Sequence, residues 1–189
     1  MNMGMGQLGN GNVVFKRKFR WTFSVSDICN GKKSIPSSFV KLASRPNLSI
    51  EETEINFLNG KMWIPGKGTW ETITVTYYDV SGVGDEGGDM SDVYSWIASV
   101  YDFTDPVALK QSSKKSSYSG TGLLTLYDGC GNSMETWTMK HMWPQAINFG
   151  ELDYSSSDEC NVELTLRYAE VKYVNDCKGK AIEPCCEGC

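Results

Sequence analysis

No stretch of the 189-residue sequence approaches the roughly 18 consecutive apolar residues that a membrane-spanning helix requires. The beginning of the chain also lacks a cationic start followed by an apolar run, which a secretion signal would show. Residues 1–12 are instead rich in Gly, Met and Asn. We therefore expect a flexible arm here, and a chain that is made and kept in a cytoplasm.

Positive charge is also scarce. Lys and Arg number 18 against 23 Asp and Glu, which gives a formal net charge of −5. Nucleic-acid-binding surfaces carry clustered Lys and Arg, so this composition argues against such a surface. One basic run exists, Lys16-Arg17-Lys18 with Arg20. It alternates with an apolar set, and we interpret it as the solvated face of a half-buried strand. The apolar set is Phe15, Phe19, Trp21, Phe23 and Val25.

Histidine occurs once, as His141, and the short motifs of common catalytic sites are missing. There is no Gly-x-Ser-x-Gly, no Walker loop and no His-Glu-x-x-His. His141 shares strand parity with Trp137, Met139 and Trp143, which favours a packed or rim histidine that is dispensable. Asp128 precedes a glycine and fits turn chemistry. We expect no catalytic residue, no cofactor and no enzyme, although a carboxylate pair assembled by the fold stays open.

Cysteine is plentiful and unevenly placed. An odd number cannot all pair within one chain, and four of the seven lie in the last thirteen residues. A Cys-x-x-Cys at 186–189 could bind zinc together with Cys177 and Cys185, but the adjacent Cys185 and Cys186 suit one tetrahedral site poorly. Free thiols or disulfides remain the alternatives, and we assign no metal. The cysteines are Cys29, Cys130, Cys160, Cys177, Cys185, Cys186 and Cys189.

Several segments alternate between apolar and polar residues, which is typical of strands. Residues 55–64 form a hairpin pattern around Asn59-Gly60, a pair that tolerates the positive φ angles of a type I′ turn. Pro65-Gly66 is expected to break the chain after it. Residues 70–78 alternate again, with Ile73, Val75 and Tyr77 on one side. These patterns predict a hairpin followed by a strand.

The second half continues the β pattern. Residues 122–127 and 134–142 flank a turn at 128–132 and predict a second hairpin. Residues 162–168 alternate as a last strand, and the parity slip before Val171 indicates a bulge or a new strand. Trp143-Pro144-Gln145 and residues 148–159 are expected to connect two strands.

One segment has helical spacing, which predicts a helix with Asp89 or Ser91 as its N-cap. Its apolar residues are Val93, Trp96, Ile97, Val100 and Tyr101. Residues 81–90 and 111–119 are predicted loops. The whole is a mainly β domain with one flanking helix, a sandwich or a barrel. We divide the chain into a flexible arm (1–13), the β domain (14–174) and a Cys-rich tail (175–189).

Four segments in this order resemble the tail tube proteins of contractile-tailed bacteriophages, which are related to the Hcp tube of type VI secretion and to R-type bacteriocin tubes. They are "INFLNGKMWIPGKGTWETITVTYYD", "SDVYSWIASVYD", "GTGLLTLYDGCGNSMETWTMKHMWP" and "VELTLRYAEVKY". Each motif alone is weak and their order is specific. The resemblance covers residues 14–173 and does not extend to the arm or the tail.

The resemblance implies a structural virion protein. Six subunits would close into a ring, and stacked rings would form the inner tail tube, a conduit for DNA ejection driven by sheath contraction. The implied partners are further copies, the tail sheath, the baseplate and tail terminator proteins, and the tape-measure protein and DNA in the bore. The alternatives are an Hcp-like tube of a contractile secretion system and a zinc-stabilised binding module.

Two groups of residues are predicted to act in assembly. The first comprises the hairpin and the last strand, with residues Phe57, Leu58, Asn59, Gly60, Met62, Val162, Leu164, Leu166 and Tyr168. The second comprises the cysteines of the tail, which are expected to link subunits, or tube to sheath, by disulfides after the virion leaves a reducing cytoplasm. They are Cys177, Cys185, Cys186 and Cys189.

Overall fold

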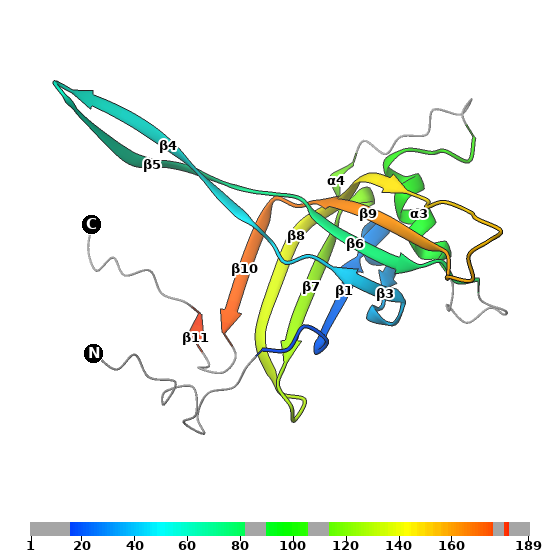
Figure 1. Ribbon diagram of the computed structural model, residues 1–189. Coiled ribbons are helices and arrows are strands. Elements are labelled where there is room, and N and C mark those ends of the chain that lie inside the picture. Colours follow the sequence, from blue (N-terminus) through cyan, green and yellow to red (C-terminus); the bar gives the residue numbers. More distant parts are fainter. Residues whose placement is uncertain (1–15, 82–89, 106–113, 176–179, 182–189) are drawn as a thin grey trace.

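The computed structural model describes residues 16–81, 90–105, 114–175 and 180–181, and it is mainly β (Figure 1). Its strands are β1 (Trp21–Asp27), β2 (Lys33–Ile35), β3 (Val40–Ala43), β4 (Leu48–Phe57), β5 (Gly60–Trp70), β6 (Ile73–Tyr78), β7 (Gly120–Tyr127), β8 (Ser133–Asn148), β9 (Asn161–Arg167), β10 (Glu170–Asn175) and β11 (Lys180–Ala181). Its helices are α2 (Ile28–Gly31), the 3-10 turn η1 (Ser37–Phe39), α3 (Ser91–Val100) and α4 (Lys115–Tyr118). The predicted fold class is confirmed, but the prediction of a loop at residues 111–119 is wrong in part, because α4 lies within it.

Nine of these strands form one continuous antiparallel system. Its order is β2-β1-β7-β8-β9-β6-β3, and β10 pairs with β8 and β11. The system folds into two sheets, because β7 and β10 pair with the first part of β8 while β9 pairs with residues 143–148 of β8. The remaining strands, β4 and β5, pair only with each other. The architecture is therefore a sandwich with a separate hairpin.

The strand β8 passes from one sheet into the other. His141 has a φ of +56° and lies where the register with β7 shifts, between the pairs Gly120↔Met142 and Thr121↔Lys140. This bulge changes which side chains face the core, so that Met139 and Met142 are both fully buried. The parity predicted for His141 is therefore interrupted at His141 itself. The residue is half-buried, as a rim histidine would be.

Regular alternation builds the core, as the sequence predicts for β6 and for residues 162–168. Ile73, Val75 and Tyr77 of β6 pair with Leu166, Leu164 and Val162 of β9, and all six side chains are fully buried. The residues between them in β6, Thr74 and Thr76, are half-buried on the other face. After residue 168 the chain begins a new strand, β10, which resolves the parity slip.

The helix α3 covers part of this core. Val93, Trp96 and Ile97 are buried, as their spacing predicts, and the Trp96 indole Nε1 donates to the Tyr118 carbonyl oxygen at 2.7 Å. The N-cap is Met90, whose side chain makes no capping hydrogen bond. The prediction of Ser91 as N-cap is therefore wrong, and Asp89 lies outside the described residues. No helix in the described ranges is long and apolar enough to cross a bilayer.

Three predictions about where strands begin and end are wrong. The first strand begins at Trp21, so the basic run precedes it in a turn, and Phe19 is 74% exposed. Pro65-Gly66 does not break the chain, because β5 continues through both residues to Trp70. Trp143-Pro144-Gln145 belongs to β8, so the connection between β8 and β9 is the loop of residues 149–160. Local composition missed all three because long-range pairing decides where a strand ends.

Candidate assembly surface

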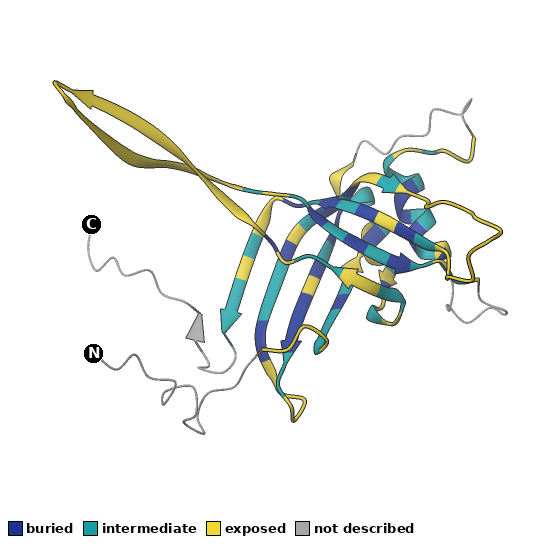
Figure 2. Cartoon of the chain, viewed as in Figure 1, coloured by how far each residue is buried: buried dark blue, intermediate teal, exposed yellow. Residues whose placement is uncertain are grey.

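The β4–β5 hairpin projects from the sandwich as a long two-stranded arm (Figure 1). Every residue of β4 is exposed, and so is every residue of β5 except the half-buried Trp70 (Figure 2). An isolated two-stranded hairpin is only marginally stable in water, because it has no second layer to pack against. The arm is thus the part of the described chain that most needs a partner.

The register sorts the hairpin side chains onto two faces. Directly opposed residues of an antiparallel pair share a face. One face therefore holds the pairs Ile55↔Met62 and Thr53↔Ile64, together with Phe57, which is 76% exposed. Four of these five residues are apolar. This apolar face lies open on a single protomer.

The opposite face of the hairpin is more polar. It holds the pairs Asn56↔Lys61 and Glu54↔Trp63. Lys61 Nζ lies 2.7 Å from a carboxylate oxygen of Glu54, so the two charges are paired across the strands. The hairpin is therefore amphipathic: one face favours an apolar partner and the other favours water.

The tip of the hairpin differs from the predicted turn. The two loop residues are Leu58 and Asn59, since Phe57 pairs with Gly60, and the positive φ falls on Leu58 at +50°. Gly60 has no positive φ, and a Cβ there would lie 3.5 Å from the Phe57 carbonyl oxygen, an ordinary contact. The expectation that Gly60 is required by the turn is therefore wrong. Leu58 is 91% exposed and puts an apolar side chain at the tip.

The base of the hairpin is fixed to the sandwich. The Glu71 N–H donates to the Asn47 carbonyl oxygen at 2.9 Å and closes the base. The Trp70 ring lies against the Tyr168 ring, with their centroids 6.4 Å apart. The arm therefore leaves the sandwich in a defined direction.

A buried carboxylate adds a further anchor beside the base. The Glu135 side chain is 2% exposed and accepts hydrogen bonds from Lys16 and from Arg45, which precedes β4. The Trp137 indole also donates to it, at 3.3 Å. Burial raises the pKa of Glu135, but these donors outweigh burial and the net pKa lies below the ordinary value. Glu135 therefore stays ionised and ties the N-terminal segment and the hairpin base to β8.

The other residues predicted for assembly lie elsewhere. Val162, Leu164 and Leu166 are fully buried and Tyr168 nearly so, which places their side chains inside the protomer. Their side chains are therefore not open on the protomer surface, whereas those of the hairpin residues are. The sequence did not reveal this division, because both segments alternate between apolar and polar residues. No local sequence signal separates the two segments, because they differ in their pairing: the hairpin strands have no third pairing partner.

The described residues include three of the cysteines and test the zinc hypothesis only in part. Cys29, Cys130 and Cys160 are free thiols. Among the described residues no group of three or more His, Cys, Asp or Glu side chains could hold a metal ion. Cys177, Cys185, Cys186 and Cys189 lie outside the described residues, so the predicted links between subunits stay a prediction.

Solved structures with the same fold come from contractile injection systems. A chain of the anti-feeding prophage baseplate superposes with a TM-score of 0.66 at 13% identity, over 86% of this chain and 97% of that one. A chain of the sheath–tube complex of the extracellular contractile injection system PVC has a TM-score of 0.63 at 18% identity, over 92% of this chain and 99% of that one. A chain of the anti-feeding prophage tube-terminating cap gives 0.63 at 15%, over 90% and 99%.

Sequence comparison adds no relative. No protein-family model matches the chain, and no curated protein sequence matches it. The shared fold covers nearly the whole length of each solved chain.

Proposed function

We propose that this protein is a tube subunit of a contractile tail, as the sequence resemblance implies. The observation that carries the proposal is the hairpin, whose apolar face is exposed over most of its length on a single protomer. A second copy supplies the missing layer, and repetition of one contact of this kind generates rings or filaments. The solved chains of the same fold come from a baseplate, a sheath–tube complex and a tube cap, which fits such an assembly.

The proposed assembly is a stack of hexameric rings with a contractile sheath outside. The hairpin, through Phe57, Leu58 and Met62, reaches a neighbouring subunit and buries its apolar face there. Baseplate and terminator proteins close the two ends. In a virion the bore holds the tape-measure protein and then the DNA, and a net charge of −5 per chain keeps DNA from adhering. Such a subunit positions other molecules and has no catalytic step.

A second candidate is a tube of a contractile injection system that is not a virion. The names of the solved structures favour it, since two are of an anti-feeding prophage and one is of an extracellular contractile injection system. The genes beside this one distinguish the candidates, because a capsid and terminase cluster marks a virion whereas toxin genes mark an injection system.

Negative-stain microscopy of the purified chain tests the proposal. Stacked hollow rings are the expected result. The double variant Ile55→Ser/Met62→Ser removes apolar area from the open face and should abolish stacking, while Asn56→Ser/Lys61→Ser on the other face is the matched control. A protein that stays monomeric at high concentration, or an apolar-face variant that stacks as the wild type does, contradicts the proposal.

The tail cysteines carry a separate part of the proposal. Disulfides between Cys177, Cys185, Cys186 or Cys189 of neighbouring subunits, or to the sheath, would hold the mature tube after it leaves the reducing cytoplasm. Electrophoresis of intact particles without reductant should then show bands above the monomer. A monomer band that does not change when reductant is omitted excludes the links.

A further inference from the structure

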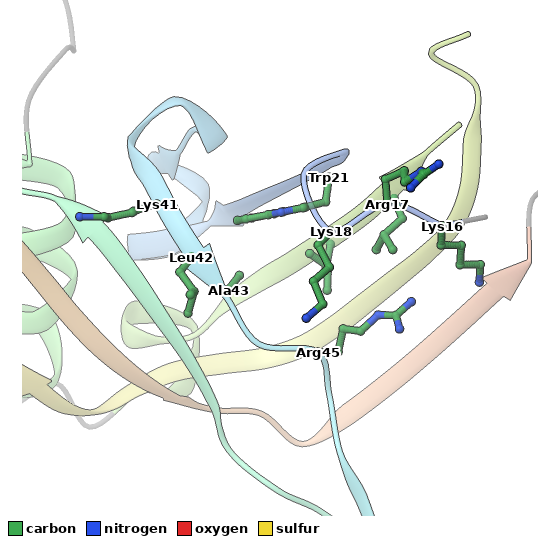
Figure 3. Close-up of a pocket in the computed structure, with 10 residues that line it drawn as sticks. Lys16, Arg17, Lys18, Trp21, Lys41, Leu42, Ala43 and Arg45 are labelled. Atoms are coloured by element: carbon green, nitrogen blue, oxygen red, sulfur yellow. The ribbon is translucent and has the colours of Figure 1, made fainter. Parts of the chain in front are cut away.

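A groove opens where the two sheets of the sandwich diverge. It lies between the N-terminal segment and β3, with inward-facing side chains of β1 and β7 as its floor, and it encloses about 420 Å³ (Figure 3). Trp21, Leu124 and Leu126 make the floor apolar, and Leu42 and Ala43 line the β3 side. Its rim is basic.

The rim carries more positive charge than the described contacts neutralise. Lys16, Arg17 and Lys18 lie on one side and Arg45 on the other (Figure 3). Among the described residues, Glu135 is the one carboxylate bonded to this rim, so the four cations exceed the described carboxylates by three. Lys41 also borders the groove, but its ammonium group points away and contacts other residues. The groove thus suits an occupant that is acidic and carries large apolar side chains.

The loop of residues 149–160 has this chemistry. It holds Glu151, Asp153, Asp158 and Glu159 and has no Lys or Arg. Glu159 lies 4.0 Å from Lys41 of the same chain, which leaves three carboxylates against the surplus of three cations. Leu152 and Tyr154 are 87% and 112% exposed, so the loop presents apolar side chains fully to solvent.

The loop is held in place although its apolar side chains are uncovered. At its start, the Phe149 ring stacks on Tyr94 and meets Phe103 edge-on, at centroid distances of 6.2 and 6.1 Å. Within it, the Asp153 carboxylate accepts from the Ser155 N–H at 2.9 Å, which shapes a turn. An ordered loop that displays Leu and Tyr side chains is a surface prepared for contact.

The loop lies beside the start of β3, whereas the groove extends along β3 and past its end to Arg45. Lys41 Nζ in β3 lies 4.0 Å from a carboxylate oxygen of Glu159 in the loop, whereas Arg45, just beyond the end of β3, is bonded to Glu135 of β8. Figure 1 shows the loop projecting from the side opposite the hairpin. A contact between this loop on one copy and the groove on another joins two different surfaces, and repeated in one direction it is the head-to-tail type that closes rings.

We infer that the 149–160 loop of one subunit docks into the basic groove of the next subunit. This contact rests on the proposed function, because it joins copies of this chain within the tube. The hairpin of a second copy is the rival occupant, but β4 and β5 carry three Glu and two Lys and so offer a much weaker charge match. The charge difference favours the loop.

Charge reversal on both sides tests this contact. The loop variant is Glu151→Lys/Asp158→Lys, which spares the turn at Asp153, and the groove variant is Arg17→Glu/Lys18→Glu, which spares the Glu135 contacts. The combined variant has both sets and regains the wild-type net charge, so it is the matched control for folding and for total charge. Thermal denaturation checks that each variant is folded, and light scattering gives the concentration at which assembly begins.

Each separate variant should raise the concentration needed for assembly at least about tenfold, because like charges then face one another. The combined variant should return to within about threefold of the wild type, since opposite charges meet again. An equimolar mixture of the two separate variants should also assemble, with the two kinds of subunit alternating. Rising salt should weaken wild-type assembly.

The other outcomes each overturn the inference. If both separate variants assemble as the wild type does, the contact does not exist, while wild-type tubes leave the proposed function intact. If only the groove variant fails, the groove takes another occupant, such as the hairpin or a partner protein. If the combined variant is folded and does not recover, the two surfaces do not meet. A wild-type chain that never assembles overturns this contact and the proposed function together.

Discussion

The sandwich and the β4–β5 hairpin are made of similar sequence and have opposite surroundings. Both are antiparallel and both alternate apolar with polar side chains. In β6 every second residue is fully buried, whereas in β4 none is. The same alternation therefore has two outcomes, a buried interior in the sandwich and an open apolar face in the hairpin. Matched substitutions in the two regions test this contrast.

The largest difference is expected between two tryptophans. Trp96 is fully buried, and Trp96→Ala should lower the free energy of unfolding by about 3–5 kcal/mol through lost burial and a cavity. Trp63 lies on the exposed hairpin, and Trp63→Ala should change the free energy of unfolding by less than about 0.5 kcal/mol. Urea denaturation of the monomer measures both. Equal losses would mean that the hairpin packs against its own protomer.

Two ion pairs give the next contrast. Glu135→Gln removes a buried charge that Lys16 and Arg45 hold, and should cost roughly 2–3 kcal/mol. Glu54→Gln removes a pair with the half-exposed Lys61 and should cost less than about 0.5 kcal/mol. Denaturation at neutral pH and low salt measures both losses. A cost for Glu54→Gln as large as that for Glu135→Gln would contradict the contrast.

The pH dependence of stability tests the contribution of the buried Glu135 separately. Because the folded-state pKa of Glu135 lies below its ordinary value of 4.5, its stabilisation is present above that pH and is lost as pH falls through the folded pKa. The Gln variant should therefore lose less stability than the wild type between neutral pH and the acid range. If the free energy of unfolding fell equally with pH in the two proteins, Glu135 would contribute no ion-pair stabilisation.

Two glycines provide a smaller contrast. A Cβ on Gly120 would lie 2.9 Å from the Ser26 carbonyl oxygen and 3.0 Å from Ile28, whereas Gly60 has room. Gly120→Ala should therefore cost on the order of 1–2 kcal/mol, because backbone must move. Gly60→Ala should be close to neutral. Thermal melting measures the stability of both variants. A lower melting temperature for Gly60→Ala would support the predicted type I′ turn.

The smallest effect is expected to be stabilising. The Tyr77 hydroxyl is buried without a hydrogen-bond partner among the described residues, and burial raises its pKa. Tyr77→Phe removes that unsatisfied group and should raise the free energy of unfolding by up to about 1 kcal/mol. Tyr78→Phe, on the half-buried face of the same strand, is the control. A loss of stability in Tyr77→Phe would show that the hydroxyl has a partner, such as a buried water.

The sequence predicts the secondary structure well where alternation and burial coincide. Ile73 to Tyr77 and Val93 to Ile97 lie in the core as their spacing indicates. Prediction from the sequence fails where the surroundings of a residue depend on distant parts of the chain. Nothing local to Pro144 shows that β9 pairs beside it, and nothing local to Glu135 shows that Lys16 and Arg45 converge there. The apolar face of the hairpin is open because β4 and β5 pair only with each other. The residue composition of the hairpin does not show this.

The sixteen-residue strand β8 has a mechanical consequence. Since β8 belongs to both sheets, one covalent backbone joins the sheets in addition to their packed side chains. A force along β8 loads its hydrogen bonds to β7, β9 and β10 together, in shear, so that many bonds must break at once. Pulling along this shared strand therefore meets resistance from both sheets at once.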